Sequence, residues 1–259
     1  MQEENDARHA GGMAPATPED RDVRSDLDMR PDAPGTLLAG YDLSMEAMAA
    51  RMLARHQSSV RIKKAHVATA RLAVIVETTL QLSNRTGFQS MSLRDLSEHS
   101  GLSMGALYAY FDSKDTLLRM ILDTVSSLVD EILAVPPPLP PRAHLAWLLG
   151  THVALTEALL PWFTFAYMEA KTFPIEARAM AVASEEHTES LIAQVLARGQ
   201  REGSFDIADT RMSAALIKPM LQDWYVKRSK YRRRGIAPSD FTRALIDFVE
   251  RAILPRTSA

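Results

Sequence analysis

Cysteine is absent from this chain of 259 residues. Its absence excludes a disulfide framework, a zinc site built on thiolates and a cysteine nucleophile, and it is typical of proteins that work in a reducing cytosol. Glu185, Glu186, His187 and Glu189 are near neighbours, but adjacent helical residues point in different directions, which favours a solvated face over a metal site. We therefore expect no metal and no cofactor.

Long apolar runs are also lacking. No stretch approaches the ~18 consecutive apolar residues of a membrane span. The N-terminus is acidic and polar, rather than a positively charged start followed by an apolar run. With 46% hydrophobic and 24% charged residues, the composition is that of a globular protein that buries a sizeable core. We expect a cytoplasmic protein that makes no contact with a membrane.

Strand signals and enzyme motifs are missing as well. No alternation of Val, Ile and Thr is bounded by hairpin turns. The chain lacks a GxGxxG sequence, a phosphate loop, a GxSxG nucleophile elbow and a HExxH motif. These absences predict an all-α protein and argue against an enzyme. A helical acyl-CoA-handling enzyme and a helical adaptor that binds no DNA stay open as alternatives.

Charge and proline divide the chain into four parts. Residues 1–58 hold eleven acidic and six basic residues, and they predict a disordered extension with an extra helix at 43–57. Residues 59–112 and the helix at 113–135 follow, and residues 59–120 hold eight basic against five acidic residues. Five prolines between positions 136 and 141 then stop the helix, so residues 136–259 form a separate part.

Helical periodicity predicts the other elements. Apolar residues recur at the spacing of one helix face, and Gly or Pro punctuates the segments between them. The predicted helices cover about 65–84, 93–99, 104–110, 114–133, 142–160, 162–171, 174–199, 210–228 and 239–254.

The segment from Met91 to Phe111 has the pattern of a helix-turn-helix. Ser92, with Asp95 three residues later, starts the first short helix with a capping-box pattern. Gly101 stands where that helix must stop in a left-handed conformation, and Ser103 caps the second helix. Helices this short are not stable alone and must be held by packing. The residues spaced to do so are Leu93, Leu96, Leu102, Leu107 and Phe111.

The outward face of the second short helix is the predicted DNA-reading surface. Small residues at Gly105 and Ala106 allow a close approach to base edges, and Ala and Met side chains can touch a thymine methyl group. Tyr108 and Tyr110 offer hydroxyls to phosphates, and Lys114 at the start of the next helix offers a further phosphate clamp. The predicted DNA-binding residues are Ser92, Arg94, Ser103, Met104, Gly105, Ala106, Tyr108, Tyr110 and Lys114.

The run from Ser92 to Leu118, with Gly101-Leu-Ser-Met-Gly-Ala-Leu-Tyr-Ala-Tyr-Phe at its centre, resembles the TetR family of bacterial transcriptional regulators. Arg71 through Phe88 is similar to the family's first helix and its terminal Gly-aromatic step. The resemblance implies a homodimer that binds a double-stranded DNA operator and responds to a small-molecule effector. One departure is Met104, which stands where many members carry a lysine or a comparable polar residue.

The resemblance also implies that 59–112 is the DNA-binding domain and that 136–259 is a domain for effector binding and dimerisation. Aromatic side chains crowd into the start of this second domain, which favours an apolar ligand site, although ordinary core packing remains the alternative for each of them. His152 could orient a ligand carboxylate or carbonyl, or be a satisfied core residue. The predicted pocket residues are Trp147, His152, Trp162, Phe163, Phe165, Tyr167, Met168, Phe173 and Trp224.

Two further features complete the expectations for this domain. The helices at 210–228 and 239–254 are amphipathic and either close the core of a monomer or pair across a two-fold axis. Between them, residues 227–234 carry six basic residues. They form a solvated loop, or else Arg232, Arg233 and Arg234 meet the phosphates of an effector such as an acyl-CoA. The operator sequence, the effector and the choice between repression and activation are not encoded in any motif.

Overall fold

The computed structural model describes residues 37–62 and 64–255, and every element of regular structure in these ranges is a helix. The all-α prediction is confirmed. The disordered extension predicted for residues 1 to about 40 falls almost wholly outside the described residues. The extra helix predicted at 43–57 is present as α3 (Met45–Arg55), and the Ser44 side chain accepts a hydrogen bond from the Ala47 amide at its start.

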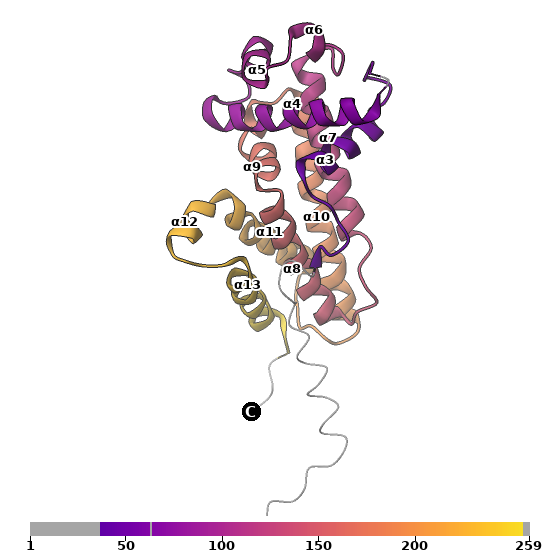
Figure 1. Ribbon diagram of the computed structural model, residues 1–259. Helices are drawn as coiled ribbons and strands as arrows, with labels where there is room; N and C mark the ends of the chain where they lie inside the picture. The colour runs from indigo at the N-terminus through magenta and orange to yellow at the C-terminus, as the bar shows by residue number, and fades with distance from the viewer. Residues whose placement is uncertain (1–36, 63, 256–259) are drawn as a thin grey trace, which may run out of the picture. The chain divides into compact units, whose positions relative to one another are not determined.

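The N-terminal half continues with four helices (Figure 1). They are α4 (Ala65–Thr86), α5 (Leu93–Ser100), α6 (Met104–Leu107) and α7 (Lys114–Leu133). Helices α3 and α5 both pack on α4, and α3 also packs on α7. Helix α4 ends at Gly87, whose φ of +83° lies in the region that glycine adopts without strain.

The C-terminal half begins where Pro141 stands in the first turn of α8, a position that tolerates proline. Its elements are α8 (Pro141–Ala158), α9 (Leu160–Met168), η1 (Ala170–Thr172), α10 (Ile175–Arg201), α11 (Thr210–Val226), α12 (Arg228–Arg233) and α13 (Pro238–Ile253). Helix α10 packs on α7, α8 and α11, and α13 packs on α8.

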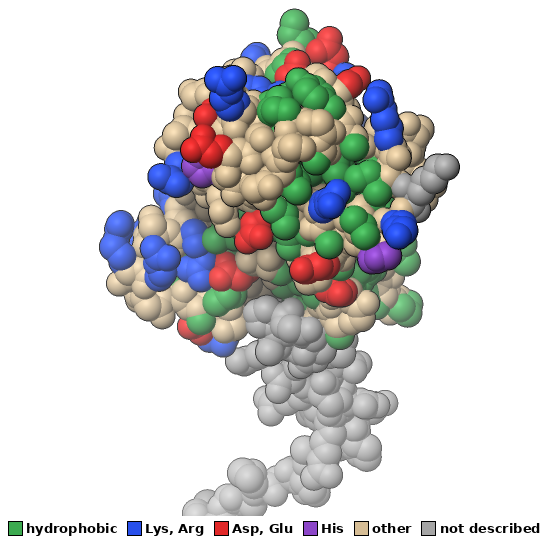
Figure 2. Space-filling view, turned by 45° about the horizontal axis from the view of Figure 1, so that its top comes forward, with side chains coloured by type: hydrophobic (Ala, Val, Ile, Leu, Met, Phe, Trp, Pro, Cys, Tyr) green, Lys and Arg blue, Asp and Glu red, His purple; other side chains and the backbone are tan. Residues whose placement is uncertain are grey.

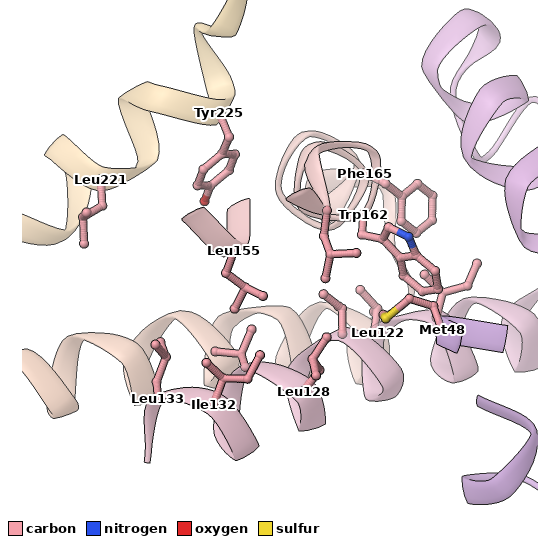
Figure 3. Close-up of a cluster of buried hydrophobic side chains, with 14 of the residues drawn as sticks. Met48, Leu122, Leu128, Ile132, Leu133, Leu155, Trp162, Phe165, Leu221 and Tyr225 are labelled. Atoms are coloured by element: carbon pink, nitrogen blue, oxygen red, sulfur yellow. The ribbon is translucent and has the colours of Figure 1, made fainter. Parts of the chain in front are cut away.

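One hydrophobic core joins both halves. Figure 3 shows Leu122, Leu128 and Ile132 of α7 in the same cluster as Leu155 of α8, and all four are at most 4% exposed. Met48 of α3 belongs to this core too, so the extra helix is part of the fold. Helix α7 therefore runs from the helix-turn-helix into the centre of the C-terminal half, as the proposed connecting helix must.

Most helix bounds lie within a few residues of the predicted ones, and two differences bear on the functional residues. Helix α6 ends at Leu107, and the three residues that follow form turns rather than continuing to Tyr110. The basic segment after Val226 is the short helix α12 rather than a loop, because Tyr231 packs on Trp224 and Phe241 and so orders it. In the described residues no single helix is long and apolar enough to cross a membrane; α8 and α9 pass such a test only as a pair, bent by 93°.

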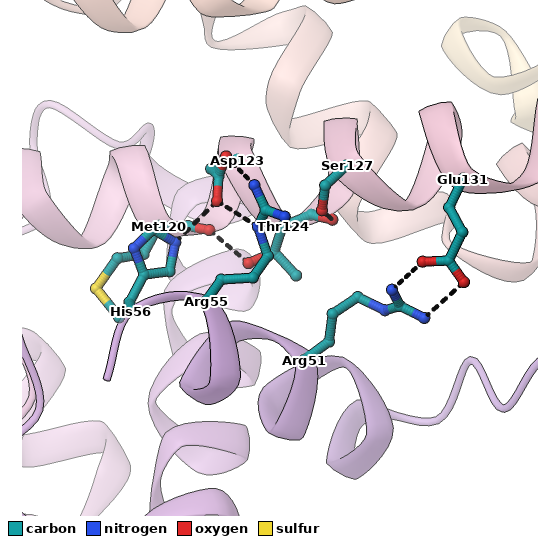
Figure 4. Close-up of polar contacts among 8 residues, drawn as sticks. All are labelled: Arg51, Arg55, His56, Met120, Asp123, Thr124, Ser127 and Glu131. Atoms are coloured by element: carbon teal, nitrogen blue, oxygen red, sulfur yellow. Dashed lines mark hydrogen bonds and ion pairs between the residues drawn. The ribbon is translucent and has the colours of Figure 1, made fainter. Parts of the chain in front are cut away.

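Charged side chains fasten α3 to α7 (Figure 4). The Arg55 guanidinium donates two hydrogen bonds to the Asp123 carboxylate, at 2.7 and 2.8 Å, and His56 Nε2 lies 3.0 Å from the same carboxylate. Arg51, one helix turn before Arg55 on α3, pairs with Glu131, two turns after Asp123 on α7. The hydrogen bonds from Arg55 hold the pKa of Asp123 below its ordinary value, and the positive charge of the Arg55 guanidinium adds a smaller effect in the same direction.

We predict that Asp123→Ala lowers the free energy of unfolding by roughly 0.5–1 kcal/mol, the range of partly exposed ion pairs. A carboxyl whose pKa is lowered by folding stabilises the protein above its unfolded pKa and stops doing so as pH falls through its folded pKa. The difference in free energy of unfolding between wild type and variant should therefore have its largest value at pH 7 and shrink only below about pH 3.9. Urea denaturation at several pH values measures it, and equal midpoints at pH 7 would show that the pair contributes nothing.

Candidate nucleic-acid interface and ligand cavity

Local side-chain bonds define the two short helices. The Ser92 hydroxyl accepts from the Asp95 amide at 3.1 Å, and the Asp95 carboxylate accepts from the Ser92 amide at 2.8 Å, so the capping box is complete. The Ser92 hydroxyl also donates to Asp95 Oδ2 at 2.7 Å, and this bond, followed by the one from the Ser92 amide, lowers the pKa of Asp95. The Ser103 hydroxyl accepts from the Ala106 amide at 3.2 Å. Between the helices Gly101 has φ +70° and ψ 12°, the left-handed conformation that the turn prediction requires.

The exposed surface of α6 carries most of the predicted DNA-reading residues. Ser103, Gly105 and Tyr108 are exposed, with Tyr108 at 45%, while Met104 and Ala106 are half-buried. Ser92 and Arg94 are exposed at the start of α5. A Cβ atom added at Gly105 would meet no atom within 4 Å, so the packing of the protein itself does not require glycine there.

Tyr110 is a correction to the sequence prediction. Its ring is 0% exposed, and its hydroxyl is buried without a hydrogen-bond partner among the described residues. Burial raises the pKa of this hydroxyl. The reason is geometric: α6 ends at Leu107, and the turn after it carries Tyr110 inward beside Phe111 instead of keeping it on the outer face. Tyr110 belongs to the core and does not reach a phosphate.

Lys114 is the second correction. Its ammonium donates to three backbone oxygens, those of Phe88, Gln89 and Met91, each at 3.0 Å, and lies 4.9 Å from the centre of the Phe88 ring. Burial lowers its pKa. All three N–H donors are thus used within the protein. In this structure Lys114 ties the start of α7 to the α4–α5 loop, and its ammonium has no donor left for the predicted phosphate contact.

Sequence analysis missed the basic residues that precede α4. The Arg61 amide donates to the Ala109 oxygen at 2.8 Å, which places the segment before α4 beside the end of the DNA-reading helix. The side chains of Arg61 and Lys64 are exposed. Their signal was the basic run that starts at Arg61. The contact between Arg61 and Ala109 is tertiary, so helical periodicity could not reveal it.

The α4–α5 loop also contacts the C-terminal half. The Phe88 amide donates to Glu169 Oε2 at 2.8 Å, and Gln89 Nε2 donates to the Thr172 oxygen at 2.6 Å. The Phe88 ring meets Phe165 and Phe173 edge-to-face, with centroids 5.5 and 6.0 Å apart. We call this set of contacts, made by loop residues 87–91 with Lys114, α9 and η1, the junction.

A cavity of about 390 Å³ lies on the other side of α9. Its walls come from α7, α8, α9, η1, α10 and α11, and most of them are apolar. The lining residues are Leu122, Val125, Ser126, Val129, His152, Phe163, Ala166, Tyr167, Met168, Ala170, Lys171, Ala181, Val182, Ser184, Glu185, Thr188, Lys218 and Tyr225. Volumes of ~300–1,000 Å³ are typical of small-molecule sites.

Four of the nine predicted pocket residues line this cavity: His152, Phe163, Tyr167 and Met168. The other five do not, because they pack elsewhere. Phe165 and Phe173 form the junction with Phe88, and Trp162 is in the core at 2% exposure. Trp224 packs between Tyr231 and Phe241, and Trp147 packs against His144.

Arg232, Arg233 and Arg234 do not line the cavity either. They are exposed at the end of α12 and just after it. Figure 2 shows a group of Lys and Arg side chains on the side of the molecule where α12 lies. The expected link between these arginines and a ligand body in the aromatic region is therefore not made in this fold.

Two polar side chains of the cavity, Lys218 and His152, are deeply buried and lie side by side. Lys218 is 6% exposed, and its Nζ lies 3.2 Å from Nε2 of His152, which is 3% exposed. Burial, followed by the charge of Lys218, holds the pKa of His152 well below its ordinary value, so this imidazole is neutral. Glu185 accepts from Gln222 Nε2 at 2.7 Å, and burial raises its pKa. Sequence analysis missed both Lys218 and Glu185 as cavity residues.

Comparison with known proteins connects this geometry to a family. Residues 75–121 match the bacterial regulatory proteins of the tetR family, and residues 138–252 match the C-terminal domain of tetracyclin repressor-like proteins. The chain belongs to the TetR family. It is a DNA-binding transcriptional regulator and not an enzyme.

Individual TetR-like proteins are similar to this chain over different lengths. An uncharacterized HTH-type transcriptional regulator of Bacillus subtilis, YfiR, is 35% identical over 66 residues, which are 26% of this chain and 32% of YfiR. The match thus spans about a third of that relative's length.

Two solved structures have the same fold with different ligands. One, a regulator from Saccharomonospora viridis in complex with choline, has a TM-score of 0.57 and 21% identity over 72% of this chain and 98% of its own. The other, the regulator FadR from Bacillus subtilis in complex with stearoyl-CoA, has a TM-score of 0.54 and 13% identity over 68% and 96%. A cation and a thioester anion are bound by one fold, so the fold does not decide the ligand.

We predict that Lys114→Met lowers the free energy of unfolding by about 1–3 kcal/mol, because three carbonyl groups lose a charged donor. Affinity for any DNA duplex should fall as α5 and α6 lose their position, while the salt dependence of binding should stay as in wild type. The matched control is Lys64→Met on the surface, which should leave stability unchanged and reduce the slope of log affinity against log salt by about one. If Lys114→Met instead kept its stability and reduced the salt slope by about one, Lys114 would be a phosphate contact after all.

Proposed function

We propose that this protein is a homodimeric repressor that occupies a palindromic operator in the cytoplasm and leaves it when a small lipophilic effector fills the cavity. One observation carries the proposal. The short segment formed by α9 and η1 lines the cavity through Tyr167, Met168 and Ala170, and bonds the α4–α5 loop through Glu169 and Thr172. A ligand that moves this segment must also move or strain the support of the helix-turn-helix.

Helix α7 supplies a second physical link between the same two sites. Its first residue, Lys114, holds the α4–α5 loop, and Leu122, Val125 and Val129 line the cavity two to four turns later. Effector release requires that the ligand bind the DNA-incompetent arrangement more tightly than the DNA-bound one. A tenfold preference supplies about 1.4 kcal/mol per site, which is a typical coupling free energy.

The reading of DNA is assigned to α6 and its neighbours. Glycine lowers the stability of a helix by roughly 1 kcal/mol relative to alanine, and the space around Gly105 is open in the free protein. A close approach to base edges accounts for a glycine there. Ser103, Met104 and Ala106 contact bases in this proposal, while Tyr108, Ser92 and Arg94, together with Arg61 and Lys64, contact phosphates.

The proposed dimer interface uses the outer faces of α11 and α13. Met212 and Leu216 lie one turn apart on α11 and are 58% and 64% exposed, and Phe248 on α13 is 62% exposed. Exposed apolar side chains of this size mark interaction surfaces. Leu245, on the inner face of α13, is 6% exposed and packs inside the monomer. A second copy of the chain covers the exposed set, and its two-fold axis accounts for a palindromic operator.

An acyl-CoA effector is less well supported than a free lipophilic molecule. The cavity, at about 390 Å³, is at the small end of the range for ligand sites, and a whole CoA thioester is larger than such a site holds. The arginines expected to meet its phosphates, Arg232 to Arg234, are not among the lining residues.

Two tyrosines two residues apart make a matched test of the DNA-binding face. After the operator has been selected from random duplexes, Tyr108→Phe should weaken binding to operator and non-operator DNA by a similar factor of about 2–10, because a phosphate contact carries no sequence information. Tyr110→Phe should leave both affinities unchanged, since its hydroxyl is buried. Fluorescence anisotropy gives the two constants for each variant.

A loss of affinity in Tyr110→Phe equal to that in Tyr108→Phe would contradict the assigned face. A change of base preference at one operator position in Tyr108→Phe would instead make Tyr108 a base contact.

A second test concerns the dimer. Leu216→Glu should convert the protein to a monomer by light scattering and lower operator affinity at least tenfold, while the cooperative melting transition is kept because Leu216 is exposed. The control is Val182→Glu on α10, another exposed apolar position at 44%, which should stay dimeric. A Leu216→Glu protein that remains dimeric, or a monomer that binds the operator as tightly as wild type, would exclude this interface.

A further inference from the structure

We propose that the effector is an organic anion, and that its carboxylate is bound inside the cavity by the ammonium of Lys218 beside the neutral imidazole of His152. This inference rests on the proposed function, because it names the ligand of the same cavity. It assigns the charge of the effector and the residue that selects it.

The environment of Lys218 is the first observation. Its side chain is 94% buried, yet the hydrogen bond that its ammonium makes within the described residues goes to a neutral acceptor, His152 Nε2, at 3.2 Å. An ammonium has three donors, and a buried charge is ordinarily paired with a charge of opposite sign. A ligand carboxylate in the adjacent space supplies that partner.

His152 is the second observation. Because Nε2 accepts from Lys218, the proton of the neutral ring is on Nδ1, and Nδ1 is buried without a partner in the described residues. A buried N–H group without an acceptor is costly. His152 lines the cavity at 3% exposure, so an acceptor atom of a ligand, or a water that the ligand holds, completes its hydrogen bonds.

The other charged groups of the lining, Glu185 and Lys171, are of opposite sign. Glu185 lines the wall and, with Glu189 on the same helix, stabilises the charged form of Lys218, but one Glu185 oxygen is already bonded to Gln222. Lys171 adds a second positive charge to the lining. Burial lowers the pKa of Lys218 to about 8, so that the ammonium is still the main form at pH 7.

The apolar residues of the lining indicate the chemistry of the rest of the ligand. Leu122, Val125, Val129 and Phe163 surround the space with carbon atoms, and Tyr225 closes it at 4% exposure. This lining suits a monocarboxylate with an aromatic or medium-length aliphatic body.

The experiment uses the full chain and pairs of probes that differ in charge alone. Calorimetry compares 3-phenylpropionate with 3-phenylpropanamide and decanoate with decanamide, with butanoate to octanoate as further acids and choline as the cationic probe. Wild type should bind at least one acid tenfold or more tightly than its amide, and should bind choline more weakly than that acid. Equal affinity of acid and amide, preference for choline, or failure of every acid to bind would overturn the proposal.

Variants then locate the charge. Lys218→Met keeps the length of the side chain without its ammonium and should abolish the preference for acid over amide. The matched control is Lys171→Met, which removes the other lysine of the cavity lining and should keep at least a threefold preference. Should Lys218→Met fail to give a cooperative melting transition, the acid-to-amide ratio of wild type still decides the matter. An unchanged ratio in folded Lys218→Met would exclude Lys218.

Operator binding, measured with and without the best acid, separates this inference from the proposed function. If the acid binds through Lys218 but operator affinity stays constant, the anion site stands and release by this ligand fails. If a neutral or cationic molecule releases the operator while the acids do not bind, the regulatory function stands and the anion site fails.

Discussion

The ammonium of Lys114 is the contact on which the arrangement of the functional parts depends. By donating to three consecutive or nearly consecutive carbonyl groups, it fixes the loop between α4 and α5 to the first turn of α7. That loop carries Phe88, which packs on α9, and leads directly into the capping box of α5. The position of the DNA-reading helix and the wall of the cavity are thus set by the same few groups. In the proposed function, this narrow junction is what couples the two sites.

Much of the fold could be predicted from the sequence because local rules determine helix ends. Ser92, Gly101 and Ser103 have roles that depend on residues within three or four positions, and the structure bears out each cap. Tyr110 and Lys114 were misjudged because exposure depends on tertiary contacts. Tyrosine and lysine are both common on DNA-binding surfaces. No neighbouring residue in the sequence indicates that Tyr110 enters the core or that Lys114 binds the carbonyl groups of a loop.

The cavity was harder to predict than the helix-turn-helix for a related reason. Aromatic residues are concentrated between Trp147 and Phe173, but periodicity cannot tell which of them face a void and which fill the core. The more specific signal was a charged residue in an apolar run, Lys218 between Ile217 and Met220 on α11. A lysine at that place in a buried helix face is expensive unless something binds it. A search for isolated charges on apolar faces would have found it.

The ion pairs of α3 have a consequence for how the chain is made. Arg51 and Glu131 are 80 positions apart in the sequence, so α3 leaves the ribosome long before its partners on α7 exist. At synthesis rates of about 5–20 residues per second, the interval is roughly 4–16 s. During that time Met48 and Met52, both at most 1% exposed in the finished protein, have no α7 to pack against. Docking of α3 on α7 must therefore wait until the chain through Glu131 has been made, and until then α4 is the partner on which α3 can pack.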